Sequence, residues 1–143
     1  MTDGDTIHVL KDNQRELKIR LTGIDSPELA RGNQPGQSIA QEALDFMNKL
    51  VLNKRVRVQS YGLDRSRSIL VFVFLNGMNV NLEIVKAGLA EIYRGKGKVI
   101  KEYREELKKA ESEARSIKRA MWIQGDKYES PAKFRARTGV REG

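Results

Sequence analysis

The sequence predicts a mixed α+β domain built on a small five-stranded β-barrel with about three helices. Several short segments alternate apolar and charged residues, which is the pattern of strands with one buried face. Segments with apolar residues at helical spacing lie between these strands and after them. The length of 143 residues leaves room for one domain with one core.

The first two strands are expected at Thr6–Leu10 and Glu16–Leu21. In the second segment, Leu17, Ile19 and Leu21 alternate with charged residues, so one face of this strand is expected to be buried. The link between the two segments is short and polar, which predicts a hairpin.

Three further strands are expected in the middle of the chain. Val56 and Val58 alternate with arginines, and Ile69–Leu75 is almost entirely apolar, as expected for a central strand. The Asn76-Gly77 pair that follows is a strong hairpin signal. Leu89–Tyr93 is expected as a short strand.

Helical spacing begins near Gln37, and further helices are expected at Val80–Ala87 and Val99–Met121. Short antiparallel strands with inserted helices favour a small barrel of the oligonucleotide-binding type. Residues 124–143 lack periodicity. We therefore expect a domain over residues 1–123 and a loosely docked C-terminal tail over residues 124–143.

The residue composition excludes several classes of site. The chain has no cysteine and one histidine, which excludes disulfide scaffolds, Cys/His zinc sites and thiol nucleophiles. A catalytic triad would have to use His8, which lies in a predicted strand and is interpreted as structural. No apolar run approaches the roughly 18 residues of a membrane span, so no membrane segment is expected.

Charge is distributed unevenly along the chain. The net charge is +8, with 27 basic and 19 acidic residues, yet residues 1–28 carry six acids and four bases. The first segment is therefore −2 and the remainder +10. This pattern is consistent with a cation held against a polyanion such as nucleic acid. Chance clustering of acids at loop positions is the alternative.

The acidic residues surround the ends of the predicted hairpin. Asp3-Gly4-Asp5 precedes the first strand, and Asp25 and Glu28 flank a proline turn that follows the second strand. A hairpin would bring Asp5 and Asp25 together, and carboxylates with a backbone carbonyl and waters suit Ca²⁺ or Mg²⁺. Glu28 would be left to act on a water molecule as a general base.

Arg20 ends the alternating strand just before this turn, where its guanidinium could hold a phosphate through two hydrogen bonds. A divalent cation, a base and an arginine are the parts required for attack on a phosphodiester. Each part is common by itself, so the interpretation depends on their occurring together.

As a set, these residues resemble the staphylococcal nuclease (thermonuclease) family. The resemblance covers residues 3 to about 135. The matching segments are Asp3-Gly4-Asp5-Thr6, Arg20 to Glu28 with its Asp25-Ser26-Pro27-Glu28 block, Gln41-Glu42-Ala43, Gly88-Leu89-Ala90, Trp122 and Ser130 to Arg135. The resemblance implies an oligonucleotide-binding barrel. It also implies a calcium-dependent endonuclease of DNA and RNA that attacks with water and leaves 3′-phosphates.

The resemblance also implies roles for individual residues. Asp5 and Asp25 correspond to the calcium carboxylates, and Ser26 stands where a backbone carbonyl contacts the metal. Glu28 corresponds to the general base, or to the residue that positions the attacking water. Arg20 corresponds to the first phosphate-binding arginine.

One catalytic position departs from the family pattern. In the block from Asp64 to Leu70, Ser68 stands where the family has its second catalytic arginine. We expect the neighbouring Arg67 to take this role, and Arg65 and Tyr93 to contact nucleic acid. If Arg67 cannot reach the phosphate, the chain is a weak or inactive nucleic-acid-binding module.

The N-terminus is a second departure. The family has most of a barrel strand before its Asp-Gly-Asp motif, but only Met1 and Thr2 precede it here, so the first strand is expected to be truncated. An exposed barrel edge invites pairing with a second copy as a homodimer. The expected substrate is single-stranded or locally opened nucleic acid. The family is often secreted, yet these opening residues do not resemble a signal peptide, so the compartment stays open.

Overall fold

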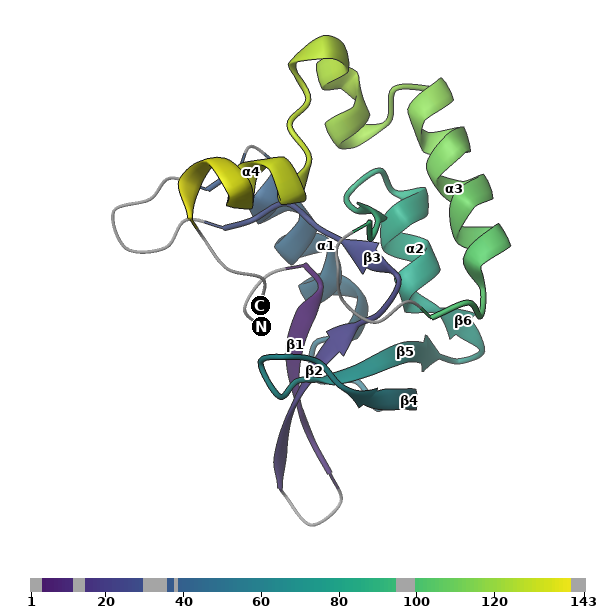
Figure 1. Ribbon diagram of the computed structural model, residues 1–143. Helices are drawn as coiled ribbons and strands as arrows, with labels where there is room; N and C mark the ends of the chain where they lie inside the picture. The colour runs from purple at the N-terminus through teal and green to yellow at the C-terminus, as the bar shows by residue number, and fades with distance from the viewer. Residues whose placement is uncertain (1–3, 12–14, 30–35, 38, 95–99, 140–143) are drawn as a thin grey trace.

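The computed structural model describes residues 4–11, 15–29, 36–37, 39–94 and 100–139. The strands are β1 (Thr6–Leu10), β2 (Glu16–Leu21), β3 (Ile24–Asp25), β4 (Arg57–Leu63), β5 (Ile69–Leu75), β6 (Met78–Asn79) and β7 (Glu91–Ile92). The helices are α1 (Ala40–Val51), α2 (Val80–Lys86), α3 (Arg104–Ser116), the 3₁₀ helix η1 (Ala120–Lys127) and α4 (Pro131–Thr138). The helices lie together on one side of the sheet, and the β1–β2 hairpin extends away from them (Figure 1).

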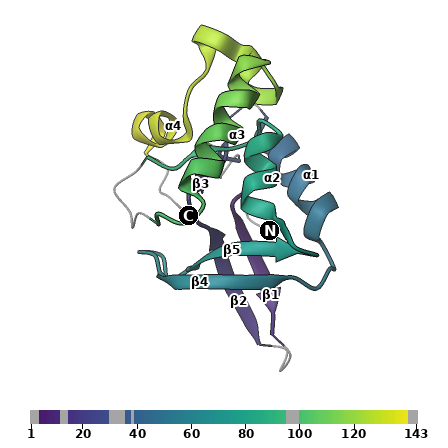
Figure 2. The same cartoon turned by 90° about the vertical axis from the view of Figure 1, so that its right-hand side faces the viewer.

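The main sheet has the order β1-β2-β5-β4, with β6 paired to β5. The pairing of β2 with β5 is parallel and the other pairings are antiparallel. The sheet is strongly twisted, so β4 and β5 run across the direction of β1 and β2 (Figure 2). Strands β3 and β7 form a separate two-stranded sheet beside the helices.

These elements confirm the predicted α+β class and the five-stranded sheet. A closed barrel is not shown, because β1 and β4 form the two ends of the strand order among the described residues. Four α-helices occur in the described ranges, where about three helices were expected. The expected truncation of the first strand concerns residues 1–3, which lie outside the described residues.

The core lies between the sheet and helices α1, α2 and α3. Strand β5 runs through its centre, as its apolar sequence predicts, and Phe72 is fully buried. Ile19 and Leu21 supply the buried face of β2, and Met47 of α1 and Leu107 of α3 pack from the helical layer. Burial of these side chains is the main source of stability for the elements that carry the site.

A buried asparagine connects α2 to the end of β2. The Asn81 side chain accepts a hydrogen bond from the Val73 amide at 3.0 Å and donates to the carbonyls of Thr22 and Val71, both at 3.0 Å. Each of these bonds satisfies a backbone group that would otherwise be costly to bury. Asn81 therefore fixes the turn that leads from β2 into β3.

The helix expected at Val99–Met121 is shorter in the structure. Helix α3 ends at Ser116, and Lys118 and Ala120 have positive φ angles. After this break the Met121 amide donates to the Gly88 carbonyl at 3.1 Å, so a tertiary contact overrides the helical pattern. Neither α3 nor any other described helix is long and apolar enough to cross a membrane.

The C-terminal segment expected as a loosely docked tail contains helix α4. Ser130 caps this helix by accepting a hydrogen bond from the Lys133 amide at 3.1 Å, and Pro131 occupies its first turn. Phe134 and Arg135 are buried. The helix is only eight residues long, which is too short for helical periodicity to identify it in the sequence.

Candidate active site

The hairpin register places Asp5 beside the end of β2. Thr6 is the first residue of β1 and pairs with Arg20, and the Leu21 amide donates to the Asp5 carbonyl at 2.8 Å. The Asp5 carboxylate accepts hydrogen bonds from the Thr6 hydroxyl at 3.1 Å and from the Ser26 amide at 3.0 Å. Asp5 and Ser26 therefore meet at one point, although one precedes the hairpin and the other follows it.

Gly4 permits this close approach. A Cβ at this position would lie 3.0 Å from the Ser26 hydroxyl oxygen and 3.1 Å from the Ala43 Cβ. A larger residue would push the first turn away from the segment that follows β3. The close packing around Gly4 therefore accounts for a residue without a side chain between the two aspartates.

Arg20 extends from β2 into the same region and is buried. Its Nη2 lies 3.9 Å from Asp5 Oδ2 and 3.9 Å from Asp25 Oδ1, so one guanidinium faces both carboxylates. The guanidinium also lies over the ring of Tyr93, with Cζ 5.4 Å from the ring centroid. The structure therefore brings together Arg20, Asp5, Asp25 and Tyr93, four of the residues singled out from the sequence.

Glu28 is buried beside this group, on the loop that follows β3. Its amide donates to Gln37 Oε1 at 3.1 Å, and the Gln37 amide donates to the Glu28 carbonyl at 2.7 Å. The Gln37 side chain also donates to the Glu129 carbonyl at 2.7 Å. Gln37 thus fixes the backbone of Glu28 and connects it to the residue that precedes the α4 cap.

Arg135 of α4 enters the same cluster, which the sequence analysis did not anticipate. Its Nη2 donates to Asp25 Oδ2 at 2.7 Å, and its Nη1 donates to Asp25 Oδ1 at 3.0 Å and to Glu28 Oε1 at 2.8 Å. Burial alone would lower the pKa of Arg135, but its bonds to Asp25 and Glu28 raise that pKa above its ordinary value. The guanidinium is therefore charged, and it neutralises part of the acidic cluster.

The pKa of Asp25 is raised to about 6, chiefly because the carboxyl is buried. The nearby charge of Asp5 raises it further, while Arg135 and Arg20 lower it. A carboxyl that is buried beside a second carboxylate is a common feature of catalytic and metal-binding sites.

The structure places the other predicted arginines on a turn before β5. Asp64 organises this turn by accepting hydrogen bonds from the Ser66 and Ser68 amides, both at 2.9 Å. Ser68 is fully buried, whereas Arg65 and Arg67 are exposed, and Arg67 has a positive φ of 64°. The turn therefore presents both arginine side chains to solvent, while the acidic cluster is buried.

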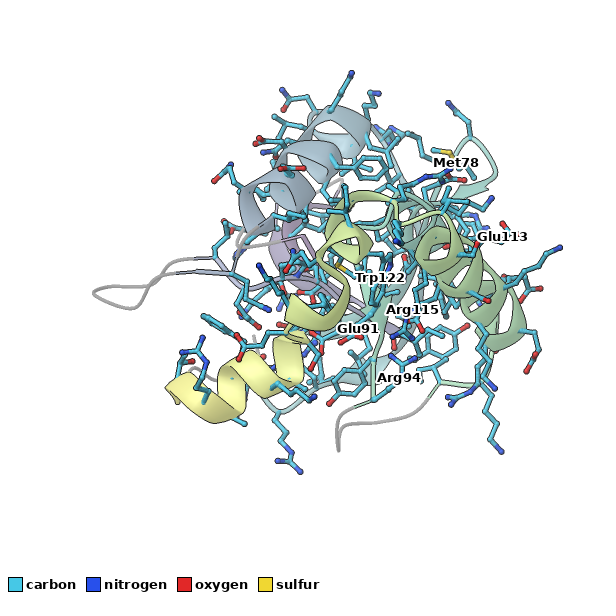
Figure 3. All side chains as sticks on the ribbon, turned by 90° about the horizontal axis from the view of Figure 1, so that it is seen from above. Met78, Glu91, Arg94, Glu113, Arg115 and Trp122 are labelled. Carbon is cyan, nitrogen blue, oxygen red and sulfur yellow. The ribbon has the colours of Figure 1, made fainter. Side chains whose placement is uncertain are left out.

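A basic pocket of about 340 Å³ lies between β7 and α3. Its charged lining residues are Arg94, Arg104, Lys108, Arg115 and one acid, Glu111. Buried Glu111 accepts hydrogen bonds from the Ile92 amide at 2.7 Å and from Arg94 Nη2 at 2.6 Å. The Arg115 guanidinium covers the ring of Trp122, with Cζ 4.5 Å from its centroid (Figure 3). The four cations of this pocket outnumber its single acid, so it can attract an anionic chain.

A sequence model described as Staphylococcal nuclease homologue matches residues 18–124, which is more than half of the chain. The chain belongs to this family. Asp25, Glu28, Arg20 and Tyr93 all fall within the matched residues, whereas Asp5 precedes them and Arg135 follows them.

Individual relatives within the family include fungal and bacterial proteins. A probable endonuclease of Leptosphaeria maculans is 34% identical over 112 residues, covering 75% of this chain and 38% of the relative. A probable endonuclease of Sclerotinia sclerotiorum is 32% identical over 132 residues, covering 88% and 50%. The thermonuclease of Staphylococcus hyicus is 34% identical over 124 residues, covering 84% and 70%. The chain thus spans half or less of the length of these two fungal relatives.

The staphylococcal nuclease homologue site contains donors of the kind that hard divalent cations prefer. Asp5 and Asp25 face each other closely enough for the charge of Asp5 to raise the pKa of Asp25, and Ser26 lies beside Asp5. In the part of the chain that the structure describes, no three acidic or histidine side chains are grouped tightly enough to hold an ion. Arg135 binds both oxygens of Asp25, so an ion at Asp25 would share these oxygens with the Arg135 guanidinium.

Proposed function

We propose that this protein is a calcium-dependent endonuclease that hydrolyses phosphodiester bonds in DNA and RNA. The observation that carries the proposal is the buried cluster in which the Arg20 guanidinium lies 3.9 Å from both Asp5 and Asp25, with Glu28 bound to the same arginine as Asp25. Membership of a nuclease family and relatives named endonuclease and thermonuclease support it.

In this proposal, Asp5, Asp25 and the backbone carbonyl of Ser26 hold the calcium ion. When bound, such an ion stabilises the charge that develops on the phosphate. The ordered backbone around these donors supports the assignment, because the Ser26 amide bonds to Asp5 and thereby holds the two segments together.

Glu28 receives a proton from the attacking water at one of its carboxylate oxygens. The water oxygen forms a bond to phosphorus, and the bond from phosphorus to the 5′-oxygen breaks. The released 5′-oxygen takes a proton from solvent, so the products carry a 3′-phosphate and a 5′-hydroxyl. Gln37 keeps the Glu28 backbone fixed during this step through hydrogen bonds on both sides. Arg20 binds the phosphate oxygens, where its charge is most effective because the site is buried.

Substrate binding is proposed along the side of the molecule that carries Tyr93 and the basic pocket. Tyr93 is half-buried against Arg20, and an unpaired base can stack on such a ring next to the bound phosphate. Arg94 is the next residue in the chain and lines the basic pocket. A single-stranded or locally opened nucleic acid fits this arrangement, because a paired base would not be free to stack.

A non-catalytic nucleic-acid-binding module is the second candidate. The contact of Arg135 with both oxygens of Asp25 favours it, because that contact competes with the proposed metal ion. The two candidates share the same nucleic-acid surface and differ only in whether the bound strand is cut.

We also propose that the sheet belongs to a small barrel of the oligonucleotide-binding type, and that two copies of the chain pair at the open edge of this sheet. Strand β1 ends the strand order among the described residues, and Leu10 at its far end is exposed. Pairing of two β1 edges would cover this strand. Light scattering tests the pairing. The proposal predicts a molar mass twice that of one chain, whereas the mass of a monomer at high protein concentration would contradict it.

The test of function is an assay of denatured DNA and of RNA with calcium and with chelator. The proposal predicts shortened products with 3′-phosphate ends when calcium is present, and intact strands when a chelator removes it. Binding of the same strands without calcium-dependent cleavage would support the binding module and contradict the nuclease.

A further inference from the structure

We infer that Arg135 is the second phosphate-binding arginine of this site, supplied by the C-terminal helix α4. This inference rests on the proposed function and adds a residue that binds the scissile phosphate together with Arg20. It is carried by the contacts, burial and charge of Arg135.

The placement of Arg135 is built into the docking of α4. Ser130 caps the helix, and the Glu129 carbonyl just before it accepts a hydrogen bond from Gln37 at 2.7 Å. Gln37 also holds the backbone of Glu28. The helix that carries Arg135 and the loop that carries Glu28 are therefore fixed to each other through one side chain.

Arg135 and Arg20 converge on one atom. Asp25 Oδ1 lies 3.0 Å from Arg135 Nη1 and 3.9 Å from Arg20 Nη2. Two guanidinium groups around one oxygen form the arrangement that binds a phosphate from two sides. Carboxylate and phosphate accept the same paired hydrogen bonds, so phosphate oxygens can replace those of Asp25 on Arg135.

Helix α4 buries two neighbouring side chains, the apolar Phe134 and the charged Arg135. Arg135 is 7% exposed, and burial of a guanidinium is costly unless its partners are specific. Its partners are Asp25 and Glu28, the two carboxylates to which the proposed chemistry assigns the metal and the water.

The charge of the cluster supports the same role. Asp5, Asp25 and Glu28 supply three negative charges, and in the absence of a bound cation Arg20 alone would leave an excess that repels a phosphodiester. Arg135 removes a second unit of this excess. Arg65 and Arg67 are exposed, whereas Arg135 joins Arg20 inside the cluster.

The test compares Arg135→Met and Arg135→Lys with Lys133→Met, which introduces the same side chain at an exposed position of the same helix. The first measurement is the affinity for a short single-stranded oligonucleotide in chelator, by fluorescence anisotropy. The second is the affinity for Ca²⁺ alone, by calorimetry. The third is the rate of cleavage in calcium.

Arg135→Met is expected to weaken oligonucleotide binding roughly 10- to 100-fold and to slow cleavage roughly 100-fold or more. Its calcium affinity is expected to be unchanged or tighter, because the competitor for Asp25 is gone. Arg135→Lys restores part of both losses, and Lys133→Met resembles the wild type. A merely structural arginine would instead lower calcium and oligonucleotide affinity together.

Oligonucleotide binding by Arg135→Met equal to that of Lys133→Met overturns the inference, as does joint loss of calcium and oligonucleotide affinity. Faster cleavage by Arg135→Met would identify Arg135 as a plug and overturn it as well. If Arg135→Met does not fold, wild-type binding and cleavage by Arg135→Lys overturn it. If the wild type itself does not cleave, the proposed function fails, and the affinities in chelator still decide the role of Arg135.

Discussion

The Arg135 guanidinium binds both carboxylate oxygens of Asp25, at 2.7 and 3.0 Å, across 110 residues of sequence. This pair makes the C-terminal helix part of the candidate active site. A cation at Asp25 therefore meets the positive charge of Arg135 at the same carboxylate.

Replacement of Arg67 by alanine is expected to leave cleavage within about twofold of the wild type. Arg67 is exposed on a turn held by Asp64, whereas Arg135 already joins Arg20 inside the buried cluster. Cleavage of denatured DNA at saturating calcium checks this. A loss of roughly 100-fold or more would restore Arg67 as the second arginine and contradict the placement of Arg135.

Calcium is expected to raise the thermal midpoint of unfolding by roughly 5–10 °C at about 100 times its dissociation constant, because an ion that binds only the folded state stabilises it by about 2.7 kcal/mol. Asp5→Asn should abolish this shift. Asp45→Asn, an exposed position on α1, should retain it. Scanning calorimetry with and without calcium measures both. Equal calcium-induced shifts of the midpoint in the two variants would show that Asp5 does not bind the ion.

Gly88→Ala is expected to destabilise the fold by about 2–4 kcal/mol. A Cβ at Gly88 would lie 2.4 Å from the Arg119 carbonyl, and its φ is +74°. Gly77→Ala is the matched control, because Gly77 has a φ of +82° but no neighbour within 4 Å. This control should cost only the roughly 1–2 kcal/mol of the left-handed backbone. Urea unfolding of both variants measures the difference, and equal losses would show that the contact with Arg119 does not matter.

The basic pocket predicts a salt effect. Arg104→Ala and Lys108→Ala, each at the pocket wall, should lower the slope of log affinity against log salt for a single-stranded oligonucleotide by about 0.7 each. Lys109→Ala removes an exposed charge from the same helix and should leave the slope unchanged. Anisotropy titrations over a range of salt concentrations measure the slopes. Identical slopes for all three variants would place the nucleic acid elsewhere.

The hairpin and the meeting of Asp5 with Asp25 could be predicted from sequence. The predicted bounds Thr6–Leu10 and Glu16–Leu21 are those of β1 and β2, because the alternation of apolar and polar residues marks the strands and a short polar link favours their pairing as a hairpin. The antiparallel register then determines which residues lie at the open end. Local pattern and chain connectivity were therefore sufficient for this half of the site.

The contribution of α4 could not be predicted in the same way. Its eight residues show no usable periodicity, and the partner of Arg135 lies 110 residues away. The end of α3 has a similar cause, because the contact between Met121 and Gly88 is tertiary and interrupts an otherwise helical pattern. Where a long-range contact decides the local structure, neither propensity nor spacing contains the information. The Ser130-Pro131 pair was the one local signal for α4, as a cap followed by a first-turn proline.

The central claim is most directly tested by the cleavage rate of Glu28→Gln on denatured DNA at saturating calcium. The amide keeps the shape of the side chain but cannot take a proton from water, so the rate should fall roughly 100- to 10,000-fold while oligonucleotide affinity is retained. Glu113→Gln, an exposed acid of α3, provides the matched control and should cleave like the wild type (Figure 3). A Glu28→Gln rate within about threefold of the wild type would contradict the assignment of Glu28 and the mechanism built on it.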